Sequence, residues 1–124
     1  MAPKDNPAVE PPKLKDMKLF RQQCFIDGKW LDADGKGTIA VNNPATGATL
    51  GTIPRMGTAE TRRAIEAANK AWPAWRSKTA KERAAILRKW FDLQIAHADE
   101  LALLLTSEQG KPLPEARGEI IYGA

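Results

Sequence analysis

The chain has 124 residues, of which 43% are hydrophobic and 27% are charged, and this composition is typical of a globular protein. A chain of this length is expected to form one domain at most. Its single cysteine excludes an internal disulfide, and with it the framework of a small secreted protein. Its apolar runs are too short for a membrane span and its amino end does not resemble a targeting signal. We therefore predict a cytoplasmic protein with no membrane partner.

The net charge of +4 is concentrated in one part of the chain. Residues 62–89 contain only Glu66 and Glu82 as acidic residues, against nine basic ones: Arg62, Arg63, Lys70, Arg76, Lys78, Lys81, Arg83, Arg88 and Lys89. On amphipathic helices such a surplus usually forms a solvated face, and we predict no nucleic-acid partner. The alternative is a small basic nucleic-acid-binding module, whose binding would weaken steeply with rising salt.

The first third of the chain predicts a tail followed by small antiparallel β structure. Residues 1–16 are rich in proline and polar side chains, and we expect them to be a disordered tail. Asp27-Gly28 is a dipeptide that favours a tight hairpin turn. Short apolar runs bounded by turn residues predict strands at residues 23–26, 29–31, 38–41 and 49–53.

The remaining two thirds predict helices. Thr58 is expected to cap the first helix, and Pro73 to end it. Thr79 and Glu82 have the spacing of a capping box at the start of the second helix. Gly110 is expected to stop the third helix. The apolar periodicity places the helices at residues 59–72, 80–97, 99–108 and 113–124.

The predicted helices carry more apolar surface than the four small strands can cover. Burial of one tryptophan is worth roughly 4–6 kcal/mol, and the chain has Trp30, Trp72, Trp75 and Trp90. A large sheet outside the chain would cover them, and the last helix runs to Ala124 without a clear stop signal. We therefore expect a piece of a larger protein. A three-helix mini-domain and a helical interaction or assembly fragment are the alternatives.

Five motifs in a fixed order resemble the amino-terminal part of the NAD(P)-dependent aldehyde dehydrogenase superfamily. They are Phe25–Trp30, Asn43–Gly47, Ile65–Trp75, Arg83–Trp90 and Glu108–Leu113. The resemblance covers residues 19–124 and is greatest to the bacterial succinate-semialdehyde dehydrogenases.

This resemblance implies an α/β fold in which residues 17–124 are the truncated amino-terminal part of a Rossmann-like cofactor-binding domain. Short antiparallel strands would precede three or four helices. The parent enzyme would be a homo-oligomer that uses NAD or NADP to oxidise succinate semialdehyde, a small aldehyde, to succinate. In the family the cysteine nucleophile, the glutamate base and the cofactor-binding strands come later in the chain. The resemblance therefore implies that this segment has no activity and binds no cofactor alone, its partner being the remainder of the enzyme.

Three side chains are candidates for chemistry, and we assign none of them a catalytic, cofactor-binding or metal role. Cys24 follows a glutamine, as the family nucleophile does, but it lies in the first strand, so we expect a packed thiol. His97 ends the second helix, where a lone histidine usually faces solvent or the helix dipole. Glu108 is expected on the apolar side of its helix, paired with Lys111 or with amides of the Gly110 turn. Some relatives hold a structural monovalent cation at this position.

Two glycine-containing segments do not have the pattern of a phosphate-binding loop. Gly110-Lys111-Pro112 follows a helix, whereas a phosphate loop leads from a strand into a helix. Gly35 and Gly37 are expected to form a hairpin loop that lacks a third glycine and a following helix. The sequence therefore contains no recognisable cofactor fingerprint.

Overall fold

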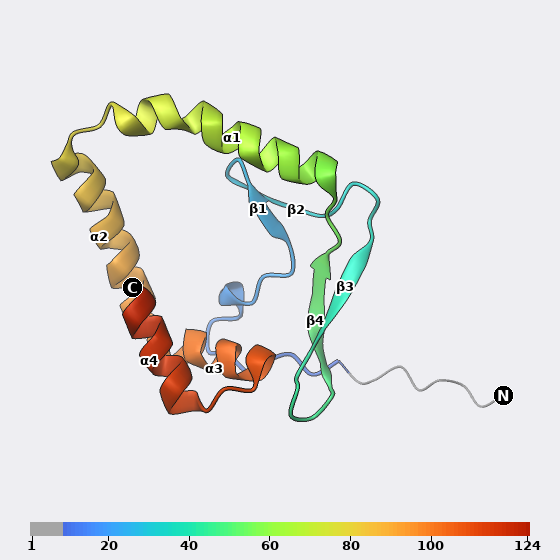
Figure 1. Ribbon diagram of the computed structural model, residues 1–124. Helices are drawn as coiled ribbons and strands as arrows, with labels where there is room; N and C mark the ends of the chain where they lie inside the picture. The colour runs from blue at the N-terminus through green and yellow to red at the C-terminus, as the bar shows by residue number, and fades with distance from the viewer. Residues whose placement is uncertain (1–8) are drawn as a thin grey trace.

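The computed structural model describes residues 9–124, which form an open ring of short strands and longer helices (Figure 1). Helix α1 (Thr58–Arg76) and helix α2 (Ala80–Ala96) form two sides of the ring. The remaining sides are formed by helices α3 (Ala98–Gln109) and α4 (Leu113–Gly123) and by the β-hairpin of residues 38–54, while the hairpin of residues 24–31 lies inside the ring next to α1. This order of short antiparallel strands and four helices confirms the α/β fold class expected from the sequence.

The strands form two separate antiparallel hairpins. Strand β1 (Cys24–Ile26) pairs with β2 (Lys29–Leu31), and β3 (Thr38–Asn42) pairs with β4 (Thr49–Pro54). Asp27 and Gly28 form the first turn with φ values of 50° and 75°, a backbone conformation that this dipeptide tolerates and that matches the twist of a hairpin. All four strands therefore lie where the alternation of apolar and turn residues predicted them.

The ends of α1 differ from the prediction. Its N-cap is Gly57, and the Glu60 carboxylate accepts the Gly57 amide at 3.0 Å, so Thr58 is the first helical residue and not the cap. Pro73 does not end the helix, which continues to Arg76. The last turn persists because the Pro73 carbonyl still accepts the Ser77 amide at 3.2 Å, although proline itself donates no bond.

The boundaries of the other helices agree with the prediction to within a residue or two. The capping box at the start of α2 is present, with the Thr79 amide donating to Glu82 at 2.7 Å and the Glu82 amide donating to Thr79 Oγ1 at 3.3 Å. Gly110 ends α3 in the left-handed conformation with φ 79°, and its amide donates to the Thr106 carbonyl.

The N-terminal arm, residues 9–19, packs against the fold and contains a short 3₁₀ helix, η1 (Met17–Leu19). Leu14 in this arm is buried, and the Asp16 amide donates to Glu100 of α3 at 2.8 Å. Residues 9–16 thus differ from the disordered tail expected for residues 1–16, because Leu14 is buried and the amides of Glu10 and Asp16 donate to acceptors elsewhere in the chain. Residues 1–8 of that predicted tail lie outside the described residues.

The interior of the described chain consists mainly of small side chains. Ala102 of α3 and Ala116 of α4 have no exposed surface, which lets these two helices approach closely. Ala98, Leu14, Ala33 and Leu50 are also buried. No large side chain among residues 9–124 is completely buried. The ring therefore lacks the large apolar core that its composition could supply.

Candidate functional site

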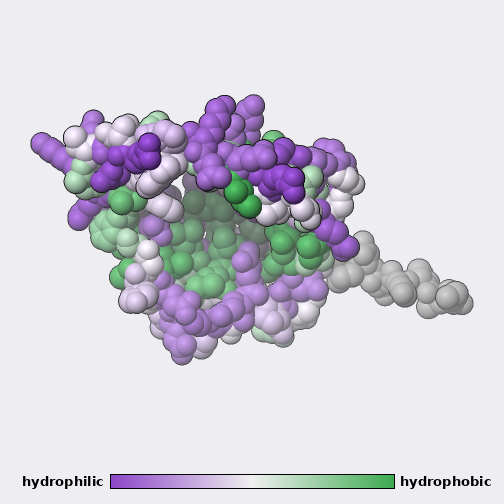
Figure 2. Space-filling view, turned by 45° about the horizontal axis from the view of Figure 1, so that its top comes forward, coloured by the Kyte–Doolittle hydropathy of each residue, from purple (hydrophilic) through white to green (hydrophobic). Residues whose placement is uncertain are grey.

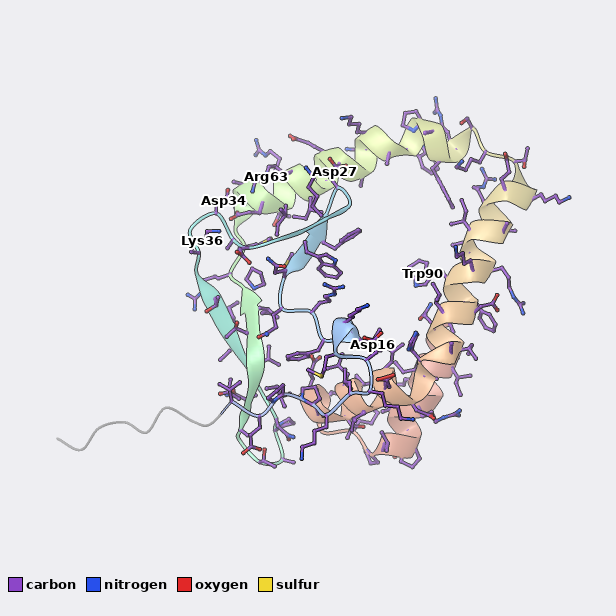
Figure 3. All side chains as sticks on the ribbon, turned by 180° about the vertical axis from the view of Figure 1, so that it is seen from behind. Asp16, Asp27, Asp34, Lys36, Arg63 and Trp90 are labelled. Atoms are coloured by element: carbon purple, nitrogen blue, oxygen red, sulfur yellow. The ribbon has the colours of Figure 1, made fainter. Side chains whose placement is uncertain are left out.

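The most extensive feature of the molecule is an apolar surface on the inner side of the ring. Figure 2 shows hydrophobic residues gathered in the hollowed centre of this view, between two hydrophilic rims. The helix stripes predicted from the periodicity remain uncovered, since Trp72 of α1 is 54% exposed and Trp90 of α2 is 62% exposed. In Figure 3 Trp90 points from α2 toward the inside of the ring. We use the term apolar face for the exposed large apolar residues of helices α1, α2 and α4 taken together, among which Figure 3 places Trp90 on the inner side of the ring: Ile65, Trp72, Ile86, Leu87, Trp90, Leu93, Ile95, Leu113, Ile121 and Tyr122.

A second group of exposed aromatic residues lies on the first hairpin. The Phe25 and Trp30 rings face each other across β1 and β2 with their centroids 5.1 Å apart, and the Arg21 guanidinium lies 4.8 Å from the Trp30 ring. Phe25 is 61% exposed. Aromatic pairs of this kind stabilise a hairpin, but their exposed faces offer further apolar area for packing.

A polar cluster fastens the start of α1 to the loop between β2 and β3 (Figure 3). Glu60 is buried and accepts the backbone amides of Asp34 at 3.1 Å and Gly57 at 3.0 Å. Hydrogen bonds from backbone amides, its own included, lower the pKa of the Glu60 carboxyl. Arg63 donates two hydrogen bonds to the Asp34 carboxylate, at 2.7 and 2.9 Å, and these bonds lower the pKa of Asp34. All of these hydrogen bonds join residues of this chain, so the cluster stabilises the contact between α1 and the β2–β3 loop.

The N-terminal end of α1 is not arranged to bind a phosphate. The β4–α1 connection is a strand–turn–helix, the arrangement in which a helix N-terminus can bind phosphate. Here the Glu60 carboxylate already accepts the Gly57 amide, and its negative charge would repel a phosphate. Gly110 lies at the C-terminal end of α3, and Gly35 and Gly37 lie in the loop from β2 to β3, so neither segment opens a helix. The hairpin loop predicted at Gly35 and Gly37 is wrong, because β2 and β3 belong to separate sheets and do not pair.

The three candidate side chains lie far apart in the fold. Cys24 is half-buried in β1 opposite Leu31. His97 joins α2 to α3, and its Nδ1 atom lies 3.8 Å from a carboxylate oxygen of Glu100. Glu108 lies near the end of α3. The structure thus brings no two of them together.

The prediction that Glu108 lies on the apolar side of its helix and pairs with Lys111 or the Gly110 turn is wrong. Its side chain is exposed, Lys111 bonds to Glu119 of α4, and the Gly110 amide is occupied by the Thr106 carbonyl. The reason is that the left-handed cap at Gly110 uses the amide that Glu108 was expected to accept.

Within residues 9–124 no group of three or more His, Cys, Asp and Glu side chains is placed to hold a metal ion. In the same residues no helix combines the length and apolar character needed to cross a membrane.

Two contacts were not predicted from the sequence: the cap that Glu60 provides and the bond of Glu100 to the arm. Glu60 could have been found, since a glutamate three residues after a possible N-cap is the signal of a capping box even when the cap is glycine. Glu100 could not, because its partner Asp16 is 84 residues away in the sequence.

Comparison with known proteins gives consistent matches over most of the chain. The model of the aldehyde dehydrogenase family matches residues 30–124. The glutarate-semialdehyde dehydrogenase of Pseudomonas putida is 67% identical over 112 residues, and the NADP-dependent succinate-semialdehyde dehydrogenase of Escherichia coli is 62% identical over 112 residues. Each alignment covers 90% of this chain but only 23% of the relative.

The fold agrees with a solved structure. The crystal structure of succinate-semialdehyde dehydrogenase from Burkholderia pseudomallei matches with a TM-score of 0.86 and 64% identity, over 88% of this chain and 23% of that one. The chain thus spans about 23% of the length of the relatives it matches.

Proposed function

Because the chain belongs to the aldehyde dehydrogenase family, we propose that it is the amino-terminal part of an NAD(P)-dependent enzyme that oxidises succinate semialdehyde to succinate. The observation that carries this proposal is the 62% identity to an enzyme named for that substrate and for NADP. The relative named for glutarate semialdehyde is 67% identical, and this favours glutarate semialdehyde as a second candidate substrate.

Both candidate substrates have an aldehyde at one end and a carboxylate at the other, and they differ by one methylene group. A difference of one methylene in a binding pocket changes specificity by about 10- to 200-fold. The deciding measurement is kcat/KM of the complete parent enzyme for the two semialdehydes. We expect at least a roughly tenfold preference for succinate semialdehyde, and the opposite preference would assign the enzyme to the five-carbon substrate.

Within the parent, the role of this segment is structural. The apolar face is the surface through which it would pack against the remainder of the enzyme, as the exposure of Trp72 and Trp90 supports. The poor fit of the α1 N-terminus to a phosphate supports the view that NAD or NADP is bound by other residues of the parent. We further propose that the parent is a cytoplasmic homo-oligomer.

The chain by itself is predicted to have no dehydrogenase activity. Incubation of the purified chain with succinate semialdehyde and either NAD or NADP should give no rise in absorbance from reduced cofactor. A steady rise that depends on both chain and aldehyde would overturn this part of the proposal. The parent enzyme, assayed with NAD and NADP in parallel, is the positive control and also identifies the preferred cofactor.

A further inference from the structure

The N-terminal arm connects two parts of the ring that are far apart in the sequence (Figure 1). At its start, the Glu10 amide donates to the Thr49 carbonyl of β4 at 2.7 Å, and Val9 forms a parallel bridge to the same residue. At its other end, the Asp16 amide donates to Glu100 of α3 at 2.8 Å. The arm therefore spans from the β3–β4 hairpin to the α3–α4 pair.

The arm also lines the seam between these two parts. A cavity of about 680 Å³ is bounded by Glu10–Lys13 and Met17 of the arm, by Asn43 and Leu50 of the hairpin, and by Ser107 of α3. On the other side of the seam, Gly110 at the end of α3 contacts Pro44 in the β3–β4 turn. The approach is so close that a Cβ atom on Gly110 would lie 2.9 Å from the proline ring. The arm thus adds a second attachment to a narrow contact.

The side chains of the arm favour a single ordered conformation of this segment. Pro11 and Pro12 restrict the backbone and lower the entropy lost on ordering. Leu14 is 9% exposed and is the large apolar anchor of the segment. Glu100 is largely shielded from solvent, with 16% of its side chain exposed, and it presents one oxygen to the Asp16 amide and the other to His97.

We propose that residues 9–19 act as a strap that fixes α3 and α4 to the β3–β4 hairpin. Burial of Leu14 holds the middle of the strap in place, and the Glu100 carboxylate binds its end by accepting the Asp16 amide. By this attachment the strap sets the position of α4, and of its Leu113, Ile121 and Tyr122 side chains, relative to the rest of the apolar face. The proposal concerns the chain itself and does not depend on the substrate or activity of the parent enzyme.

Hydrogen–deuterium exchange of the full 124-residue chain, resolved to single amides, tests the strap. In the unaltered chain the amides of Glu10 and Asp16 should exchange at least about tenfold more slowly than in an unstructured peptide, the factor that one ordinary hydrogen bond provides. Glu100→Ala should remove that protection at Asp16, whereas Glu100→Gln, which keeps an acceptor oxygen, should retain most of it.

The coupling between the two parts is tested by Leu14→Ala. This variant should speed exchange in the arm, at Thr49 and Leu50 of β4, and throughout α3, while leaving the β1–β2 hairpin unchanged. The matched control is Lys15→Ala, a neighbouring exposed residue of the arm, which should behave as the unaltered chain does. Unprotected arm amides, in a folded or an unfolded chain, would overturn the proposal. So would a Leu14→Ala effect confined to the arm.

Discussion

Glu60 joins the start of α1 to the loop between β2 and β3. It is buried, its carboxylate caps α1 through the Gly57 amide, and it holds the β2–β3 loop through the Asp34 amide. A buried carboxylate is tolerated only when hydrogen bonds replace its hydration, and these two amides do so. The same bonds favour the ionised form, which is why the pKa of Glu60 is lowered.

The lowered pKa of Glu60 predicts how stability depends on pH. A carboxyl whose pKa is lower in the folded chain than its ordinary value of 4.5 stabilises the fold fully above that value. This contribution is lost as the pH falls through the folded pKa, because the folded state then has to be protonated. We therefore expect the chain to lose stability below about pH 4.5, measured as the urea midpoint by circular dichroism, and Glu60→Gln to show a flatter dependence in this window.

The control for this prediction removes a carboxylate from the same helix without touching the cap. Glu66 is exposed in the middle of α1, and Glu66→Gln should retain the acid-dependent loss of stability. If Glu60→Gln and Glu66→Gln gave the same pH profile, the hydrogen bonds of Glu60 would not be the source of the effect.

At the scale of single elements, the capping box of α2 is a local feature with a separable contribution. Thr79 Oγ1 accepts the Glu82 amide, and the Thr79 amide donates to the Glu82 carboxylate. Thr79→Ala removes the hydroxyl that accepts the Glu82 amide and should destabilise the chain by about 1 kcal/mol. The midpoint of thermal unfolding should fall accordingly. Thr79→Ser, which keeps the hydroxyl, should recover most of the loss, and a full loss in the serine variant would argue against capping.

The contact between α3 and α4 depends on alanine. Ala102 and Ala116 have no exposed surface, so a larger side chain at either position has no space to occupy. Ala102→Leu should destabilise the chain by about 1–3 kcal/mol through overpacking, read from urea unfolding. Ala85→Leu on the exposed surface of α2 makes the same chemical change where there is space. It should have little effect, and equal losses in both variants would contradict the packing argument.

The elements that were predictable from the sequence are those whose signals are local. The Asp27-Gly28 turn, the Thr79–Glu82 capping box and the Gly110 stop each depend on residues within four positions of one another, and all three are present. The end of α1 was not predictable, because Pro73 weakens a helix without having to end it when Ser77 donates to the carbonyls of Pro73 and Ala74 in the preceding turn.

Features that depend on distant residues were missed for a physical reason. The arm resembles a disordered tail in composition, and it is held in place by the burial of Leu14 and by contacts with Thr49 and Glu100, which lie far along the chain. Of the apolar face, the sequence predicted the stripes of α1 and α2 and their need for a partner, but not how the ring would arrange them. Exposure of Trp72 and Trp90 agrees with that need.

At the scale of the whole molecule, the apolar face predicts that the isolated chain associates with itself. Exposed apolar patches larger than a few hundred Å² are rare on stable monomers, and here they include indoles of two helices. The 13.6 kDa chain should therefore elute larger than a monomer in size-exclusion chromatography with light scattering, and it should bind a hydrophobic dye. Trp90→Arg should shift it toward the monomer, since a charge within the face opposes its burial. Lys89→Ala, an exposed neighbour outside the apolar face, is the control and should leave the size unchanged. A monomeric chain that binds no dye would mean that these side chains find cover within the chain itself, and the need for a larger partner would disappear.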